Sequence, residues 1–243
     1  MPFLSRRNLL IGSAAAGAIK AASSEIHSKK MKVVVTGGHP GDPEYGCGGT
    51  IARYSDLGHE VTLLYLNRGE KGCPGKSAKA CGVARVSEAR KACEILKAHA
   101  RFADQTDGEA VIDQAHYDAF QRLLEAEKPD VVFTQWPIDN HRDHRAISTL
   151  VYDAWLRMKK SFALYYYEVS DGDDTLLFHP TDYVNITQTE ARKRAACYAH
   201  ASQSPDRFYS LQSQVMRFRG IESGYTQAEA FIRHPQSEGN LLP

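Results

Sequence analysis

The sequence predicts an α/β fold, a three-layer Rossmann-like sandwich with a mostly parallel sheet. The first observation is a β-α-β opening, in which apolar runs at 31–36 and 59–66 flank a helical pattern at 50–57. Short connections between such elements are typical of parallel sheets. The second observation is another apolar run, at 130–135, which predicts a buried strand and is followed by a helical pattern at 143–158.

The segment between the second strand and the strand at 130–135 contains a loop and two helices. Residues 67–82 are rich in Gly, Lys and Pro, which is typical of a surface loop. Apolar residues at helical spacing then predict helices at 83–98 and 117–127. The second of these helices ends before Pro129, because proline disfavours a helical conformation in the residue that precedes it.

The C-terminal part of the chain is predicted to add two strands and further helices. The strands are expected at 162–168 and 182–186, where apolar and aromatic residues gather. Thr187 and Glu190 have the spacing of a capping box, which predicts the start of a helix. From there on, we expect the C-terminal third to be mostly helical.

Residues 1–23 have the layout of a twin-arginine-type signal peptide, with an approximate end. Arg6 and Arg7 precede a weakly apolar stretch at 10–19, and small residues follow it. The alternative is a disordered tail with two chance arginines. The export interpretation predicts a periplasmic or extracellular protein with no stable membrane anchor after processing, since the stretch is far shorter than the ~20 residues that span a bilayer.

The composition is that of one soluble globular domain, which we place at residues 31–243. Of the 243 residues, 42% are hydrophobic and 24% are charged, and the net charge is +1. There is no basic stripe with interleaved aromatic residues, so we expect no nucleic-acid partner. The sequence leaves the oligomeric state open.

The cysteines do not form a zinc-binding pattern. No CxxC pair occurs among the five of them, which are Cys47, Cys73, Cys81, Cys93 and Cys197. Cys73 and Cys81 share a loop and can pair in an oxidising compartment. The alternative, that all five are reduced or buried, is equally compatible with the sequence.

Two groups of metal-binding side chains follow two of the predicted parallel strands. His39 and Asp42 come after the first strand, among glycines that let the backbone curl tightly. His141, Asp143 and His144 come after the strand at 130–135. Because open α/β sheets place their chemistry at the carboxyl ends of the strands, the two groups are expected to meet.

The side chains in these groups predict a metal site. Catalytic zinc commonly takes three protein ligands and keeps one position open, and His39, Asp42 and His144 supply two imidazoles and one carboxylate. His141 shares a helix face with His144, and Asp143 can hold a neighbouring imidazole in its tautomer. A nucleotide-phosphate loop is disfavoured, because no GxGxxG pattern follows the first strand.

These residues carry a resemblance to the PIG-L/LmbE family of zinc-dependent de-N-acetylases. The family has a strand, then His-Pro-Asp-Asp-Glu, a Gly-Cys-Gly-Gly-Thr-type helix start and a distal His-x-Asp-His. This chain has HPGDP at 39–43, GCGGT at 46–50 and HRDH at 141–144 in the same order. The similarity spans most of residues 31–232.

The resemblance implies a mechanism. His39, Asp42 and His144 would bind Zn²⁺, which would polarise an amide carbonyl and activate a water. His141 would stabilise the oxyanion and protonate the departing amine, with Asp143 orienting it. The expected reaction is removal of an N-acetyl group from a small substrate that contains an amino sugar.

Gly41 departs from the family pattern, because it stands where the family has the aspartate that acts as general base. General-base catalysis is worth roughly 10²–10⁴ in rate. Glu44 or Asp139 can replace the lost base, or the metal-activated water can react without one. The remaining alternatives are a catalytically impaired relative that binds metal or sugar, and a hydrolase that acts on a different bond.

Overall fold

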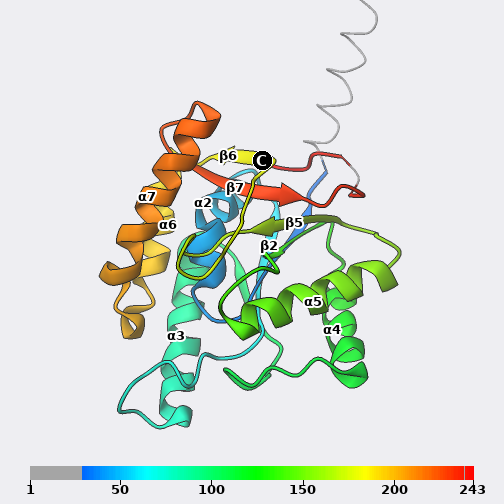
Figure 1. The fold of residues 1–243 in the computed structure, drawn as a ribbon, viewed down its shortest axis with the longest axis vertical. Helices are drawn as coiled ribbons and strands as arrows, with labels where there is room; N and C mark the ends of the chain where they lie inside the picture. The colour runs from blue at the N-terminus through cyan, green and yellow to red at the C-terminus, as the bar shows by residue number, and fades with distance from the viewer. Residues whose placement is uncertain (1–28, 238) are drawn as a thin grey trace, which may run out of the picture. The chain divides into compact units, whose positions relative to one another are not determined.

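The computed structural model describes residues 29–237 and 239–243, so the predicted signal at 1–23 lies outside the described residues. From residue 31 onward the chain forms one compact unit. Its sheet has seven strands in the order β3-β2-β1-β4-β5-β7-β6 (Figure 1). The strands are β1 Lys32–Gly37, β2 Glu60–Tyr65, β3 His99–Phe102, β4 Val131–Gln135, β5 Ala163–Tyr167, β6 Asp182–Asn185 and β7 Ala228–Arg233.

The sheet is mixed and mostly parallel, which confirms the predicted fold class. β1 pairs in parallel with both β2 and β4, and the parallel order continues to β3 on one side and to β5 on the other. β7 runs opposite to the other strands of the described sheet and pairs antiparallel with β5 and with β6. The carboxyl ends of β1 and β4 therefore lie side by side.

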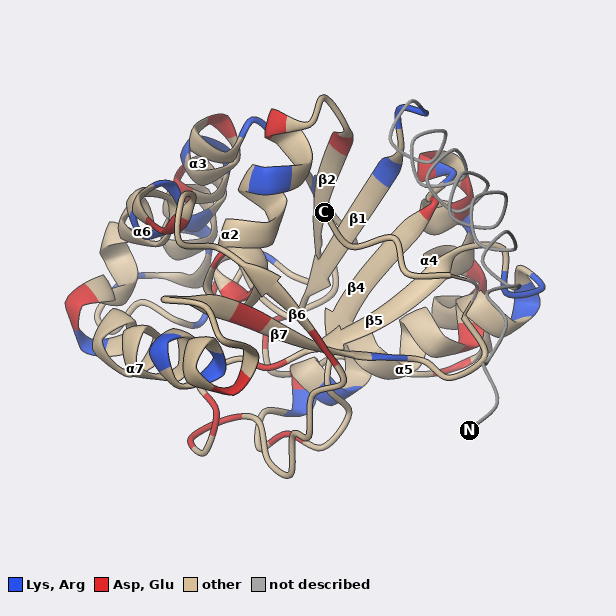
Figure 2. Ribbon diagram, turned by 90° about the horizontal axis from the view of Figure 1, so that it is seen from above, with Lys and Arg blue, Asp and Glu red and all other residues tan. Residues whose placement is uncertain are grey.

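Helices cover both faces of the sheet, as Figure 2 shows. α4 and α5 lie on one face, and α2, α3, α6 and α7 lie on the other. Their bounds are α2 Asp42–Asp56, α3 Ala78–Leu96, α4 Gln114–Glu127, α5 Arg142–Arg157, α6 Glu190–Tyr198 and α7 Pro205–Ser223, with a 3₁₀ turn, η1, at Ala201–Gln203.

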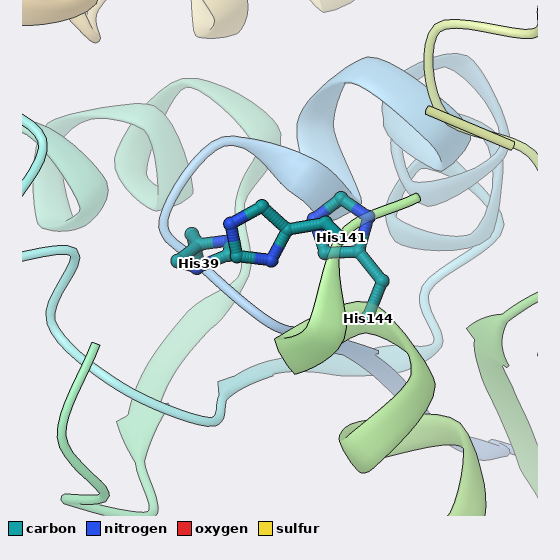
Figure 3. A group of neighbouring side chains, drawn as sticks. All are labelled: His39, His141 and His144. Atoms are coloured by element: carbon teal, nitrogen blue, oxygen red, sulfur yellow. The ribbon is translucent and has the colours of Figure 1, made fainter. Parts of the chain in front are cut away.

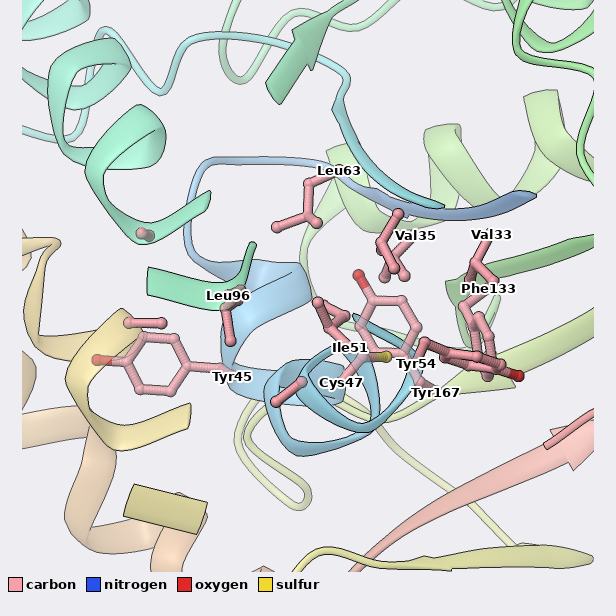
Figure 4. Close-up of a cluster of buried hydrophobic side chains, with 14 of the residues drawn as sticks. Val33, Val35, Tyr45, Cys47, Ile51, Tyr54, Leu63, Leu96, Phe133 and Tyr167 are labelled. Atoms are coloured by element: carbon pink, nitrogen blue, oxygen red, sulfur yellow. The ribbon is translucent and has the colours of Figure 1, made fainter. Parts of the chain in front are cut away.

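Alternation along β1 divides the hydrophobic core into two layers. Val33 and Val35 point to the side of α2, where they join a cluster that includes Ile51 and Tyr167 (Figure 4). Val34 points to the opposite side and packs in the cluster beneath α4 and α5. Because successive side chains of a strand face opposite ways, a strand buried on both faces is apolar throughout.

α2 begins at Asp42, well before the predicted start at residue 50, because the glycine cluster belongs to the helix. Gly46 lies so close to the ring of Tyr167 that a Cβ atom there would approach Tyr167 Cδ2 to 2.2 Å. The glycine therefore serves close packing of α2 on β5. Glu229 of β7 also binds this helix, since its carboxylate accepts hydrogen bonds from the N–H groups of Gly49 and Thr50, at 2.9 and 2.7 Å.

Several other expectations were wrong. Two strands, β3 and β7, were not expected, and β7 lies in the C-terminal third that the sequence predicts as mostly helical. α3 begins at Ala78 rather than at residue 83, with Ser77 Oγ accepting from Ala80 N. The predicted capping box at Thr187 is not formed, because the N-cap of α6 is Thr189.

The structure decides between the two alternatives for the cysteines. Cys73 and Cys81 form a disulfide that closes the loop between β2 and α3. Cys47, Cys93 and Cys197 are free and buried. Among the described residues, no helix is long and apolar enough to cross a membrane.

We predict that Gly46→Ala destabilises the fold by about 2–3 kcal/mol, because the added methyl group collides with the fully buried Tyr167 ring. Urea unfolding measures this change. Gly82→Ala in α3 is the matched control, since a Cβ there comes no closer than 3.3 Å to its neighbours. Equal unfolding midpoints for the two variants would contradict the packing argument.

Candidate metal centre

The two predicted groups of side chains meet at the carboxyl ends of β1 and β4. His39 lies in the short connection after β1, and Asp42 is the first residue of α2. His141 is the N-cap of α5, and His144 lies in its first turn. Figure 3 shows the three histidine rings gathered between these segments, and one nitrogen from each ring lies within 4.8 Å of the others.

The two separations between Asp42 and the predicted histidine ligands are close to those that a tetrahedral ion requires. Asp42 Oδ2 lies 3.3 Å from His39 Nδ1 and 3.2 Å from His144 Nε2. An ion bound tetrahedrally at about 2.0–2.1 Å from each donor places the donors about 3.3–3.4 Å apart. The donor set therefore fits a divalent cation such as zinc.

Gln135, the last residue of β4, fastens the connection after β1 to the neighbouring strand. Its Oε1 accepts from Gly38 N at 2.8 Å, and its Nε2 donates to Asp42 Oδ2 at 3.3 Å. Asp42 Oδ2 also accepts from the backbone N–H of His39 at 2.8 Å. These bonds hold Asp42 between the two imidazoles.

Carboxylates contact the far nitrogens of both predicted imidazole ligands. Asp139 Oδ1 lies 3.0 Å from His144 Nδ1, and Asp143 Oδ2 lies 3.1 Å from His39 Nε2. Such carboxylates fix the tautomer and orientation of a metal-binding histidine. The side chain of Asp143 thus contacts His39, whereas the sequence reasoning assigned it to His141. Its contact with His141 comes from its backbone N–H, which donates to His141 Nδ1 at 3.2 Å.

Asp107 is a member of the site that sequence reasoning missed. Its Oδ1 lies 3.2 Å from His39 Nε2, and its Oδ2 accepts from Lys71 N at 2.9 Å. Asp107 lies in the connection after β3, a short strand with a half-exposed surface. A polar strand of four residues gives little hydrophobic signal, so the position of Asp107 at a strand end was not evident.

The electrostatics of the site favour positive charge at its centre. Burial alone lowers the pKa of His39, but hydrogen bonds to Asp107, Asp143 and Asp42 outweigh it and raise the pKa well above its usual value. Burial also lowers the pKa of His144, but Asp42 and Asp139 outweigh this effect and raise the pKa to about 9. A metal ion needs neutral imidazoles, so it takes the place of these protons when it binds.

The pKa of His141 is shifted in the opposite direction, to a lower value. Burial and then the charges of His39 and His144 lower the pKa of this half-buried imidazole. Because His141 Nδ1 accepts a hydrogen bond from Asp143 N, the single proton of the neutral ring lies on Nε2. His141 can therefore donate a hydrogen bond from Nε2 to an oxygen in the site.

Comparison with known proteins places the chain in a family. The profile of the PIG-L family, described as GlcNAc-PI de-N-acetylase, matches residues 34–155, which include every predicted ligand. The chain belongs to the PIG-L family. A diacetylchitobiose deacetylase of Thermococcus kodakarensis is 27% identical to it over 218 residues, covering 82% of this chain and 81% of that protein.

Solved structures share the PIG-L fold. The conserved protein TT1542 of Thermus thermophilus has a TM-score of 0.75 at 26% identity, over 86% of this chain and 97% of that one. GalB, the 4-carboxy-2-hydroxymuconate hydratase of Pseudomonas putida, has a TM-score of 0.76 at 21% identity, over 86% and 99%. The likeness to GalB concerns the fold alone, and a fold does not determine a reaction.

At Gly41, where the resemblance to the family implies an aspartate, the backbone conformation favours glycine. Gly41 has φ +112°, a conformation that residues with a side chain rarely adopt. Glu44 is fully buried, and its Oε2 accepts from Gly41 N at 3.2 Å. Its Oε1 accepts from Tyr65 Oη and contacts His200 Nε2, both at 2.8 Å. The carboxylate of Glu44 thus holds the start of α2.

We predict that Asp139→Asn weakens zinc binding by about 10–100-fold, because the variant loses the carboxylate that orients His144. Competition with a chromogenic chelator at constant pH measures the affinity. Asp173→Asn is the control, since Asp173 is exposed and lies in a different loop. An unchanged affinity in Asp139→Asn would mean that this contact does not support the ligand.

Proposed function

We propose that the protein is a zinc-dependent hydrolase that removes an N-acetyl group from a small substrate containing an amino sugar. The observation that carries this proposal is the spacing of His39 Nδ1, Asp42 Oδ2 and His144 Nε2. Membership of a de-N-acetylase family and the relative named as a diacetylchitobiose deacetylase support the choice of reaction and substrate class.

The metal would be held by His39, Asp42 and His144. When bound, zinc supplies Lewis-acid polarisation of an amide carbonyl and lowers the pKa of a water molecule. The protein's own contribution is to fix the tautomer and the orientation of the two imidazoles. Asp143 and Asp139 do this through the outer ring nitrogens, as their contacts of 3.1 and 3.0 Å indicate.

His141 is suited to two tasks in amide hydrolysis. Its Nε2–H can donate a hydrogen bond to the carbonyl oxygen as negative charge develops there, which is the usual role of an oxyanion-binding group. When the C–N bond breaks, the leaving nitrogen needs a proton, and the imidazolium form of His141 can deliver one and become neutral. Proton transfer from a positioned side chain of this kind is general acid catalysis.

A second candidate function follows from Gly41. Without the family's aspartate, the protein could retain the metal and a sugar but fail to hydrolyse the amide. Hydrolysis and binding both use the metal, so the fit of the donor set to a divalent cation does not distinguish between them. The two are separated by turnover, because only the hydrolase releases acetate.

We predict that Asp42→Ala and His144→Ala each abolish zinc retention and acetate release. Each variant loses one of three protein donors, and the remaining two do not complete a zinc site. Elemental mass spectrometry measures the metal, and an acetate assay with N-acetylated mono- and disaccharides measures turnover. His99→Ala is the control, because His99 is exposed at the amino end of β3, away from the site.

Undiminished zinc content in either variant would contradict the assignment of that residue as a ligand. Stoichiometric zinc in the wild-type protein without acetate release from any substrate of the panel would instead favour the binding function. Both results come from the same preparations, so they can be compared directly.

We also propose that the protein is exported by the twin-arginine route. The Cys73–Cys81 disulfide supports this, because disulfides persist mainly in oxidising compartments. We expect Arg6→Lys combined with Arg7→Lys to retain the full-length protein in the cytoplasm, while the wild-type protein is recovered from the periplasm. The double variant keeps the charge, so equal distribution of the two proteins between cell fractions would count against this route.

A further inference from the structure

The proposed hydrolysis is faster when a group accepts a proton from the attacking water, and position 41 provides none. Three carboxylates beside the predicted ligands belong to Asp107, Asp139 and Asp143. A base must reach the side of the site on which the substrate and water lie. A carboxylate that contacts the ring nitrogen facing away from the predicted metal position therefore cannot act as this base.

Asp139 lies behind His144. Its Oδ1 contacts His144 Nδ1, whereas His144 Nε2 faces Asp42 and the predicted metal position. Its Oδ1 also accepts from the backbone N–H of His141 at 2.7 Å, and its Oδ2 accepts from Thr175 Oγ1 at 3.1 Å. Both oxygens are thus bound to protein groups on the side away from the metal.

The same reasoning excludes Asp107 and Asp143. Both contact His39 Nε2, while His39 Nδ1 faces Asp42. Asp143 Oδ2 also accepts from Asn67 Nδ2 and from Gly108 N, at 2.9 and 2.7 Å. Glu44 is excluded because its carboxylate is buried in the start of α2, as described above.

Asp174 remains. It lies in the loop between β5 and β6, which crosses the loop between β4 and α5 next to the site. Asn140 N donates to Asp174 O at 2.8 Å, and Thr175 forms an isolated antiparallel bridge with Asp139. These bonds hold the backbone of Asp174 beside the residue that precedes His141. Its side chain is half-buried, and within the described part of the chain no hydrogen bond or ion pair to its carboxylate is recorded.

We propose that Asp174 is the general base of this site and replaces the aspartate that the chain lacks at Gly41. This inference rests on the proposed function, since a general base is required only if the protein hydrolyses its substrate. It deepens that function by assigning the proton acceptor to a loop that follows β5.

The charges around Asp174 support this role. Burial is the largest influence and raises the pKa of its carboxyl group to about 6. Among charged groups, His144 of α5 lowers the pKa, while Asp42 of α2, Asp139 and the neighbouring Asp173 raise it. At neutral pH the group is ionised, yet it is a stronger base than an exposed aspartate, which suits general-base catalysis.

The step balances in atoms and charge. The Asp174 carboxylate takes a proton from water as the water oxygen forms a bond to the amide carbon. The C–N bond then breaks, and the leaving nitrogen receives a proton from the imidazolium form of His141, which becomes neutral. The products are acetic acid and a free amine. Of the two protons that acetic acid and Asp174 then give up, one restores the imidazolium of His141 and the other goes to solvent.

We expect Asp174→Asn to lower kcat by at least about 100-fold while zinc content stays at the wild-type level. The variant should fold normally, because no recorded contact among the described residues depends on this carboxylate. In the wild-type protein kcat/KM should fall as the pH drops below about 6, where Asp174 becomes protonated. The variant should lose this acid limb. Zinc content is measured at each pH to separate proton transfer from metal release.

Asp173→Asn is the matched control, because it removes the same charge from the adjacent, exposed position. It should retain kcat within about threefold, as expected for a group outside the reaction. If Asp174→Asn retains kcat within the same limit, or keeps the acid limb, the proposal is overturned.

A binding measurement separates this inference from the proposed function. Acetate is an anion, so the negative charge of Asp174 should weaken its binding to the zinc-loaded protein at a pH of about 7.5, where the carboxylate is ionised. Asp174→Asn should bind acetate about tenfold more tightly than the wild type, and Asp173→Asn should not. If the wild type releases no acetate, the proposed function and the catalytic role both fail. The acetate affinities then still decide whether Asp174 faces the metal, and equal affinities would contradict its placement.

Discussion

Negative charge concentrated around two imidazole rings determines how the rest of this site is built. Asp42, Asp107 and Asp143 surround His39, and none of the three is well exposed. Charges removed from water are costly unless they are paired, so this group requires cations at its centre. Without a metal, protons on the imidazoles serve this purpose, and a divalent cation can replace them. The hydrogen bonds from Gln135, Asn67 and Gly108 then keep the carboxylates in place in either state.

Much of the fold and the site was predictable because two signals coincide. β1 and β4 are apolar on both faces, and His and Asp residues follow each of them in the connection to the next helix. Strands of this kind are recognised by hydrophobicity, and their parallel pairing brings the two groups together. β7 escaped prediction because its Glu229 is buried against Lys193, at 2.5 Å, and interrupts the apolar pattern. Asp107 was not predicted because β3, the strand before it, was not predicted. Asp174 lies in a loop with no local sequence pattern that points to the site.

Glycine at position 41 affects the backbone and the hydrogen bonds around it, in addition to removing a carboxylate. The positive φ of Gly41, the bond from its N–H to Glu44 and the contact of Glu44 with His200 form one connected arrangement at the start of α2. An aspartate inserted here would strain the backbone. The local structure therefore favours glycine at this position. The connection after β1 holds the predicted ligands, so the proposed proton acceptor lies in a segment that is distant in sequence.

The disulfide of Cys73 and Cys81 affects the same edge of the sheet through entropy. It closes a short loop, with a separation of 8 residues, and such a closure removes roughly 2–3 kcal/mol of conformational freedom from the unfolded chain. Cys81 is also buried against Gly69, next to the segment whose Asn67 binds Asp143. The disulfide thus restricts the segment that leads from Asn67 to α3 before any ligand binds. Oxidation of two thiols therefore helps to preorganise the residue that holds Asp143.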